Sequence, residues 1–113
     1  MSLKSNFKQI VESEWEKGDF RPIAEVHKST DELFNGWEIN FSEYFEECLG
    51  CKYKVAFFQT ASNRRFFVTE YFNVPSPLTN IFVLYDKEMA MSDLNEIKSL
   101  LNLRDADLMV YDF

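Results

Sequence analysis

The middle of the chain, residues 52–86, contains three runs of aromatic and β-branched residues, each about as long as a strand. Polar and turn-forming residues separate these runs at positions 60–64 and 73–79. Short runs of this composition, bounded by turn formers, are typical of β-strands. The sequence therefore predicts a hairpin over residues 52–72 and a further strand over residues 80–86.

Both faces of these predicted strands are apolar. In the first strand Tyr53, Val55 and Phe57 point to one face, and Ala56 and Phe58 point to the other. A strand that is apolar on both faces needs cover on both faces. Either helices flank the sheet on two sides, or some aromatic surface stays exposed or encloses a cavity.

Apolar residues recur at helical spacing in three segments outside this block, residues 5–17, 42–50 and 92–101. Residues 107–112 have the composition of a last strand. Helices before and after a block of strands are typical of the α+β class. We expect a single α+β domain over residues 1–113, with a mostly antiparallel sheet of four to five strands packed with about three helices.

Shorter elements are predicted between these segments. Residues 19–28 fit both the helical and the strand period poorly, and Pro22 could open a helix or precede a short edge strand. An extended segment is the favoured interpretation. Ser29 and Glu32 form a capping-box pattern that indicates a short helical turn. Residues 37–41 alternate as a half-buried strand does.

The net charge of −7 is distributed unevenly along the chain. Residues 1–50 carry 11 acids and 5 bases, residues 51–85 carry 1 acid and 4 bases, and residues 86–113 carry 7 acids and 3 bases. Binding to nucleic acid or to an anionic membrane depends on clustered Lys and Arg. The acidic composition of this chain therefore argues against both partners. A basic protein is the better electrostatic match.

The expected location is the cytoplasm. The sequence has no run that approaches the ~18 consecutive apolar residues of a membrane-spanning helix. Its N-terminus lacks the basic region followed by an apolar region that marks a secretory signal. We therefore expect a cytoplasmic protein without a membrane partner.

Five charged residues are candidates for binding a partner. Glu43, Glu46 and Glu47 share one outward face of the second predicted helix. Such a row is usually a solvated face, and the alternative is a docking stripe for a cationic partner. Arg64 and Arg65 lie at the predicted hairpin tip, where they either protect the hairpin against edge pairing or contact a partner.

Cys48 and Cys51 form the only motif-like spacing, C-x-x-C. A redox pair belongs at a helix N-terminus, whereas this pair follows Glu46 and Glu47 at a predicted helix C-terminus. A zinc site needs two more ligands, and His27 is the only histidine in the chain. We expect a core Cys48 and a free Cys51 in a reducing compartment, with no metal and no cofactor.

No catalytic group can be named from the sequence. His27 needs an orienting partner and a nucleophile, and no pattern places either beside it. The three glycines all lie at predicted helix ends, not in a phosphate-binding loop. The sequence therefore favours no class of enzyme.

Three functions remain open. The first is a stoichiometric binding protein that masks a basic partner such as a toxin nuclease, as an immunity protein or an antitoxin does. It rests on the acidic flanks and on the supply of aromatic residues suited to binding hot spots. Another is a subunit of a homo-oligomer, whose apolar sheet face or last strand pairs with a second copy.

The remaining function is that of a small-molecule-binding domain or a small enzyme. Trp37, Tyr53 and Tyr71 would line an aromatic pocket between the sheet and the helices, together with Phe57 and Tyr85. The composition permits such a pocket but does not require it. The masking function therefore ranks first.

Overall fold

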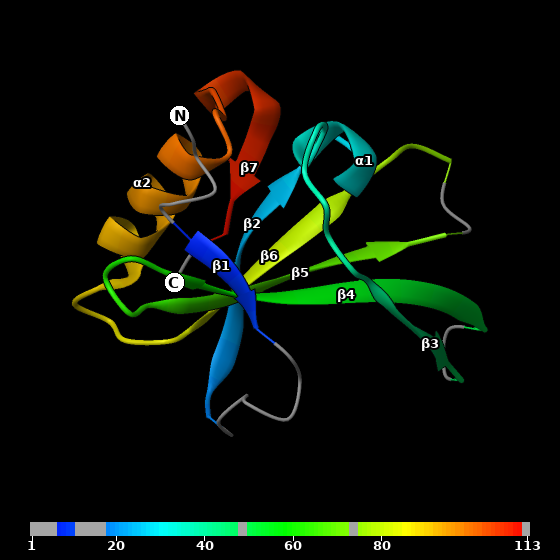
Figure 1. Ribbon diagram of the computed structural model, residues 1–113, viewed down its shortest axis with the longest axis horizontal. Helices are drawn as coiled ribbons and strands as arrows, with labels where there is room; N and C mark the ends of the chain where they lie inside the picture. Colours follow the sequence, from blue (N-terminus) through cyan, green and yellow to red (C-terminus); the bar gives the residue numbers. More distant parts are fainter. Residues whose placement is uncertain (1–6, 11–17, 48–49, 73–74, 112–113) are drawn as a thin grey trace.

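The computed structural model describes residues 7–10, 18–47, 50–72 and 75–111. Within these residues the chain forms a seven-stranded antiparallel sheet, two α-helices and one 3₁₀ helix (Figure 1). The strands are β1 (Phe7–Ile10), β2 (Phe20–Val26), β3 (Ser42–Glu46), β4 (Cys51–Thr60), β5 (Arg65–Tyr71), β6 (Thr79–Leu84) and β7 (Leu108–Val110). The helices are α1 (Thr30–Leu33), α2 (Ala90–Leu100) and the 3₁₀ helix η3 (Asp105–Asp107).

The sheet is built on a meander of β4, β5 and β6, which pair in succession. Strand β2 pairs with β6, and β7 pairs with β2 and forms one edge of the sheet. The other edge is shared by two strands, because β3 pairs with the first half of β4 and β1 pairs with its second half. The ten-residue β4 therefore has two short strands along its outer side.

The side chain of Gln9 links these two short strands. Its amide nitrogen donates to the carbonyl oxygen of Asn40, and the backbone N–H of Asn40 donates to Gln9 Oε1 over 3.0 Å. Two facing residues of an antiparallel sheet exchange the same pair of hydrogen bonds through their backbones. The Gln9 amide thus joins β1 to the segment that leads into β3.

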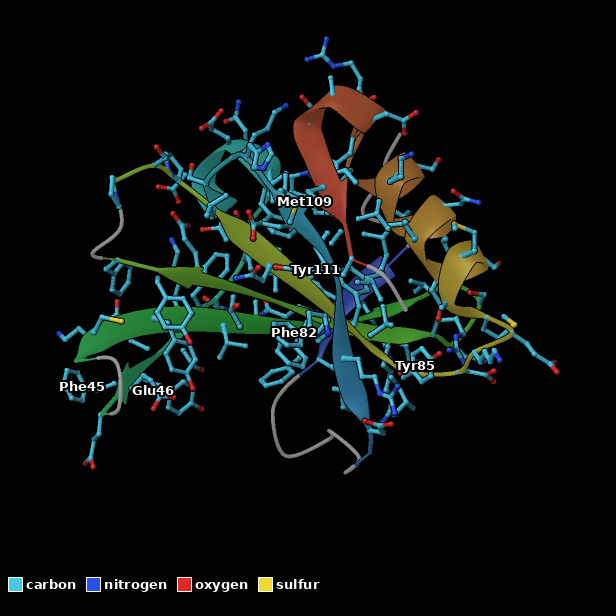
Figure 2. All side chains as sticks on the ribbon, turned by 180° about the vertical axis from the view of Figure 1, so that it is seen from behind. Phe45, Glu46, Phe82, Tyr85, Met109 and Tyr111 are labelled. Atoms are coloured by element: carbon cyan, nitrogen blue, oxygen red, sulfur yellow. The ribbon has the colours of Figure 1, made fainter. Side chains whose placement is uncertain are left out.

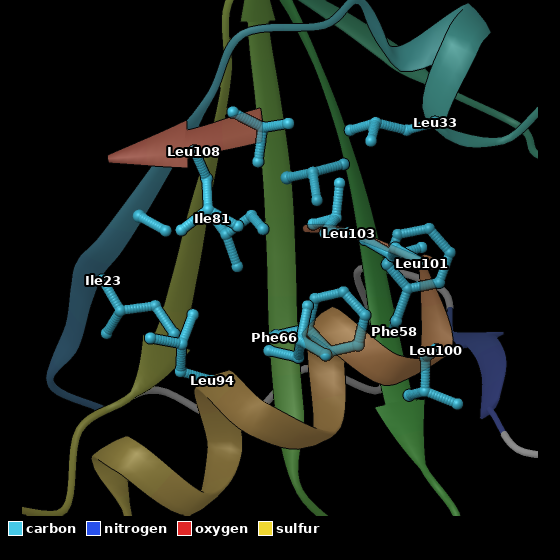
Figure 3. Packing of buried hydrophobic residues seen from close by; sticks show 14 of the residues in the cluster. Ile23, Leu33, Phe58, Phe66, Ile81, Leu94, Leu100, Leu101, Leu103 and Leu108 are labelled. Carbon is cyan, nitrogen blue, oxygen red and sulfur yellow. The ribbon is translucent and has the colours of Figure 1, made fainter. Parts of the chain in front are cut away.

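Both helices belong to one hydrophobic core on one face of the sheet, here termed the helix face (Figure 3). Phe58, Phe66 and Ile81 of the central strands cluster there with Leu94 of α2. The Phe58 ring stacks on the Phe66 ring, with centroids 5.1 Å apart, and on the Phe34 ring that follows α1, with centroids 5.2 Å apart. Figure 1 shows both helices on the same side of β4, β5 and β6.

Local sequence explains both helices. The Ser29 hydroxyl accepts a hydrogen bond from the backbone N–H of Glu32 over 3.2 Å, and this contact caps α1. Helix α2 buries Leu94, Ile97 and Leu100, whose spacing forms one apolar stripe. None of the helices in the described residues is long and apolar enough to cross a membrane.

The structure contains the predicted hairpin of β4 and β5 and the predicted strand that follows it, β6. The extended segment within residues 19–28 is β2, and the last predicted strand, within residues 107–112, is the shorter β7. The predicted helix over residues 92–101 is α2, which begins two positions earlier. The hairpin strands, β6 and α2 each have a clear local pattern of apolar or β-forming residues, whereas β2 does not.

The prediction of about three helices on four to five strands is wrong, because the fold is mostly sheet. Residues 42–50, expected as a helix, contain strand β3. Of the helix expected over residues 5–17, residues 7–10 form β1 and the others lie outside the described residues. Both segments pair with the outer side of β4, and this pairing outweighs local helix propensity. Residues 37–41, expected as a strand, have no regular structure.

Asp107 is the last residue of η3, and its carboxylate is buried. It accepts hydrogen bonds from the Arg104 guanidinium over 3.1 Å and from the Arg104 backbone N–H over 2.9 Å. These two contacts lower the pKa of Asp107 to about 2. The Lys28 ammonium lies 3.7 Å from the same carboxylate and acts in the same direction.

We expect Phe58→Ala to lower the free energy of unfolding by about 3–5 kcal/mol, because it removes a ring from the centre of the core. Phe45→Ala is the matched control, since Phe45 is 58% exposed, and it should cost less than about 1 kcal/mol. Urea unfolding followed by circular dichroism measures both. Equal losses in the two variants would contradict this description of the core.

We expect Asp107→Asn to reduce the dependence of stability on pH in acid. The pKa of Asp107 is lowered in the folded protein, so its stabilisation is present above the ordinary carboxyl value of about 4 and is lost as the pH falls toward 2. The variant should be less stable at pH 7 and should lose less stability between pH 4 and pH 2. Urea unfolding across this pH range tests the prediction, and parallel curves for the two proteins would contradict it.

Candidate functional site

The face of the sheet opposite the helices is rich in aromatic residues and is here termed the open face. Phe57, Phe67 and Phe82 lie on it and are half-buried. No helix of the described residues packs on this face. Figure 2, seen from behind, labels Phe82 and Tyr111 near the centre of the sheet and Glu46 at its outer end, on β3.

A groove of about 640 Å³ lies on the open face. Its floor consists of Val55, Thr69 and Asn80, which are register partners across β4, β5 and β6. These residues are smaller than their neighbours two positions along each strand, so the floor lies between two rows of rings. Because the floor follows the pairing direction, the groove runs across the strands.

One side of the groove is a row of tyrosines, the tyrosine wall, formed by Tyr44, Tyr53 and Tyr71. Strand register aligns them, since Tyr44 pairs with Tyr53 and Tyr53 pairs with Tyr71. Their ring centroids are 5.8 and 5.2 Å apart along the row. Cross-strand aromatic pairs of this kind stabilise a sheet, so the wall is also part of the fold.

The other side is a row of phenylalanines, the phenylalanine wall, formed by Phe57, Phe67 and Phe82. Their ring centroids are 5.5 and 4.5 Å apart, and the rings of Phe67 and Phe82 are almost parallel. The two walls are four residues apart along β4, or about 13 Å between Cα atoms at the usual rise of a strand. One wall carries hydroxyl groups and the other is entirely apolar.

Tyr111 and Pro22 complete the lining beside the floor residue Asn80. The Tyr111 hydroxyl donates to Glu25 Oε2 over 3.0 Å and lies 3.3 Å from Asn80 Oδ1. Burial raises the pKa of Tyr111, and its hydrogen bond to the Glu25 carboxylate raises it further. This part of the groove therefore holds a neutral tyrosine next to a carboxylate.

The groove favours positive charge. No Lys or Arg is found among the described residues that line it. Glu25 lies behind the Tyr111 hydroxyl, and Glu46 follows Tyr44 by two residues on the same face of β3. Burial raises the pKa of Tyr71, and the negative charge of Glu46 adds to this effect. Aromatic ring faces and nearby carboxylates both attract cations.

The structure brings together two of the three residues predicted to bind a ligand. Tyr53 and Tyr71 stand side by side in the tyrosine wall. Trp37 lies elsewhere, because it packs against the core on the helix face. The space between sheet and helices, where a pocket was expected, is filled by that core, and the groove lies on the opposite face. Tyr85 is also outside the groove, beneath the guanidinium of Arg21.

The three predicted acidic residues do not form a helical stripe. In β3 successive side chains point to opposite faces of the sheet. Glu43 pairs with Lys54 on the helix face, whereas Glu46 belongs to the open face. Glu47 follows the strand and is exposed. Only Glu46 therefore stands near the groove.

Arg64 forms an ion pair within the protein. Its Nε and Nη2 atoms each donate to the Asp93 carboxylate over 2.8 Å, and Nη2 also lies 3.3 Å from the Leu84 carbonyl oxygen. Asp93 is buried in α2, so this pair ties the hairpin turn to the helix. Arg65 is half-buried on the open face opposite Gln59, beyond the phenylalanine wall.

Sequence reasoning missed most of the groove lining. Phe67 and Phe82 could have been found from the alternation in their strands, because register places them beside Phe57. Tyr44 and Tyr111 had no such signal. Each reaches the groove only because an edge segment pairs with a neighbouring strand, and Tyr44 belongs to residues 42–50, which were expected to form a helix.

Some of the 18 acidic residues of the flanks are paired within the protein. Among the described residues, ion pairs with Lys or Arg hold five flank carboxylates, those of Asp19, Asp31, Asp93, Asp105 and Asp107, and also Glu70 of the central strands. These pairs leave the net charge of −7 unchanged. A partner would therefore encounter the net negative charge of the whole protein and the carboxylates near the groove.

The described part of the chain contains no group of three or more residues that could hold a metal ion. Cys51 carries a free thiol, and Cys48 lies outside the described residues. No protein-family model, no curated protein and no solved structure matches the chain.

We expect Glu46→Gln to lower the pKa of Tyr71, because the variant removes a negative charge that disfavours the tyrosinate. The pKa of Tyr71 should still lie above the ordinary value, since burial remains the larger cause. Glu25→Gln is the matched control, and it should lower the pKa of Tyr111 while leaving that of Tyr71 unchanged. NMR titration of ¹³C-labelled tyrosine rings measures both values. Equal shifts of Tyr71 in the two variants would contradict the placement of Glu46.

Proposed function

We propose that the protein is a stoichiometric binding protein that masks a basic protein partner, in the manner of an immunity protein or an antitoxin. The aromatic groove of the open face is the proposed contact surface. One observation carries this proposal: a tyrosine-walled groove, with carboxylates beside it and no Lys or Arg among the described residues that line it. Such a surface suits the cationic side chains of another protein.

The composition of the groove supports a protein partner. Tyrosine is one of the residues most enriched among those that dominate the energy of protein interfaces. Its ring buries a large apolar area while its hydroxyl keeps a hydrogen-bonding partner. In the groove three tyrosines stand in one row, and Tyr44 at the outer end is already 36% exposed.

The net charge supports a basic partner in particular. A charge of −7 attracts a basic protein over distances comparable with the Debye length, about 8–10 Å at physiological salt. This attraction mainly accelerates association and selects partners of opposite charge. The short-range contacts in the groove then determine how long the complex lasts.

The cytoplasm is the proposed location. The free thiol of Cys51 is compatible with a reducing compartment. Immunoblotting of fractionated source cells tests this part of the proposal, and recovery of the protein only outside the cytoplasm would contradict it.

A second candidate, a small-molecule-binding domain, is favoured by the size of the groove. A volume of about 640 Å³ falls within the range of pockets that hold small ligands. Its aromatic walls would hold a flat, apolar compound. A thermal-shift screen against a metabolite library separates the two candidates, because only this second function predicts that a metabolite alone raises the melting temperature.

The masking function predicts selective capture of a basic protein from native lysate of the source cell. The bait protein and its Phe45→Ala variant should retain that protein in equal amount, since Phe45 lies on the other face of β3. Tyr44→Ala combined with Tyr71→Ala should retain at least about tenfold less, as expected when hot-spot residues are removed. Raising the salt from 50 to 500 mM should weaken binding.

Mass spectrometry of the retained fraction identifies the protein, and urea unfolding checks that each variant is folded. Retention of only acidic proteins, or equal retention by all three baits, would contradict the masking function. Binding that does not change with salt would contradict the electrostatic part of the proposal.

A further inference from the structure

We infer that the groove recognises an extended segment of the partner and that the tyrosine wall holds an arginine side chain of that segment. The guanidinium would stack on the rings of Tyr53 and Tyr71, on the side where Glu46 lies. This inference rests on the proposed function and specifies the chemical group that the groove recognises. Its three supports are the shape of the groove, its charge, and an arrangement found elsewhere in the same chain.

The shape of the groove fits an extended chain. The groove spans five neighbouring strands, from Tyr44 on β3 to Pro22 on β2. Four strand spacings correspond to about 19 Å, which five to six extended residues cover. The walls on either side are rows of rings set by strand register, and Val55 and Thr69 at the floor are almost fully buried.

The two walls differ in the side chains that they suit. The phenylalanine wall presents no polar atom from its side chains, so it suits apolar side chains of the segment. The tyrosine wall adds hydroxyl oxygens that can accept hydrogen bonds, and Glu46 adds negative charge beside it. In an extended segment successive side chains point in opposite directions, and long ones reach either wall.

Arginine suits the tyrosine wall better than lysine. A guanidinium is planar, stacks on aromatic rings and can donate to a carboxylate at the same time. An ammonium is a compact, strongly hydrated charge that loses more on leaving water. The three rings lie in a row with centroids 5.8 and 5.2 Å apart and with neighbouring planes tilted by 33° and 35°, so a flat group in the groove can contact more than one ring.

The chain already holds one of its own arginines in this way. The Arg21 guanidinium carbon lies 4.1 Å from the centroid of the Tyr85 ring. The same guanidinium forms an ion pair with Asp19 over 2.8 Å. A tyrosine ring with a neighbouring carboxylate thus binds a guanidinium in this protein, and the tyrosine wall with Glu46 repeats that combination on the open face.

A peptide titration tests the inference on the full chain. The probe is the acetylated and amidated peptide Gly-Val-Arg-Val-Gly, and its matched controls carry lysine or citrulline in place of arginine. NMR spectra of the ¹³C-labelled tyrosine rings report binding at each ring. We expect saturable shifts of Tyr53 and Tyr71, with Tyr85 unchanged because Arg21 already covers it.

The arginine peptide should bind at least about tenfold more tightly than the citrulline peptide and measurably more tightly than the lysine peptide. Glu46→Gln should weaken its binding several-fold, and Tyr71→Leu should abolish it, whereas Phe45→Ala should leave it unchanged. Spectra of the free variants check that each is folded.

Three results would overturn the inference: equal binding of the lysine or citrulline peptide, shifts confined to Tyr111, or no shift with 10 mM arginine peptide. The capture experiment stays independent of this titration. A basic partner that depends on Tyr44 and Tyr71, found together with a failed titration, would leave the masking function standing and the arginine assignment wrong. Arginine binding without any basic partner would overturn the masking function instead.

Discussion

In the described part of the chain, both α-helices pack on the same face of a seven-stranded sheet, and the rest of the structure depends on this one-sided packing. The stacked rings of Phe34, Phe58 and Phe66 take up the helix face, where α2 closes over them. The same strands carry equally large rings on their other side. Strand register places these rings in rows, where they half-bury one another. The groove therefore exists because the described helices leave this face of the sheet uncovered.

Local patterns predicted the elements that carry their own apolar period. The hairpin of β4 and β5 is rich in aromatic and β-branched residues, and α2 has a clear apolar stripe through Leu94, Ile97 and Leu100. Strands β1 and β3 lack such a pattern. Their strand conformation depends on pairing with β4, which is distant in the sequence. Their residues fit a helix locally, and only pairing with β4 selects the strand.

The candidate site was predictable to a similar extent. Tyr53 and Tyr71 were identified as aromatic ligand-binding residues, and alternation placed Tyr53 with Phe57 on one face. Which face the helices would leave open could not be derived, because that depends on packing between distant segments. The prediction of an acidic row was wrong because residues 42–46 form a strand. A strand places Glu43 and Glu46 on opposite faces of the sheet, whereas a helix would place them on the same face.

The divided outer side of β4 also bears on how its backbone edge is protected. A bare ten-residue strand, apolar on both faces, would be a template for cross-β growth. Strands β1 and β3 occupy it in pieces of four and five residues, joined through the Gln9 amide. Detachment of either piece alone uncovers a segment shorter than the six or seven residues of a steric zipper, so fraying at one end does not by itself expose a seed for fibrils.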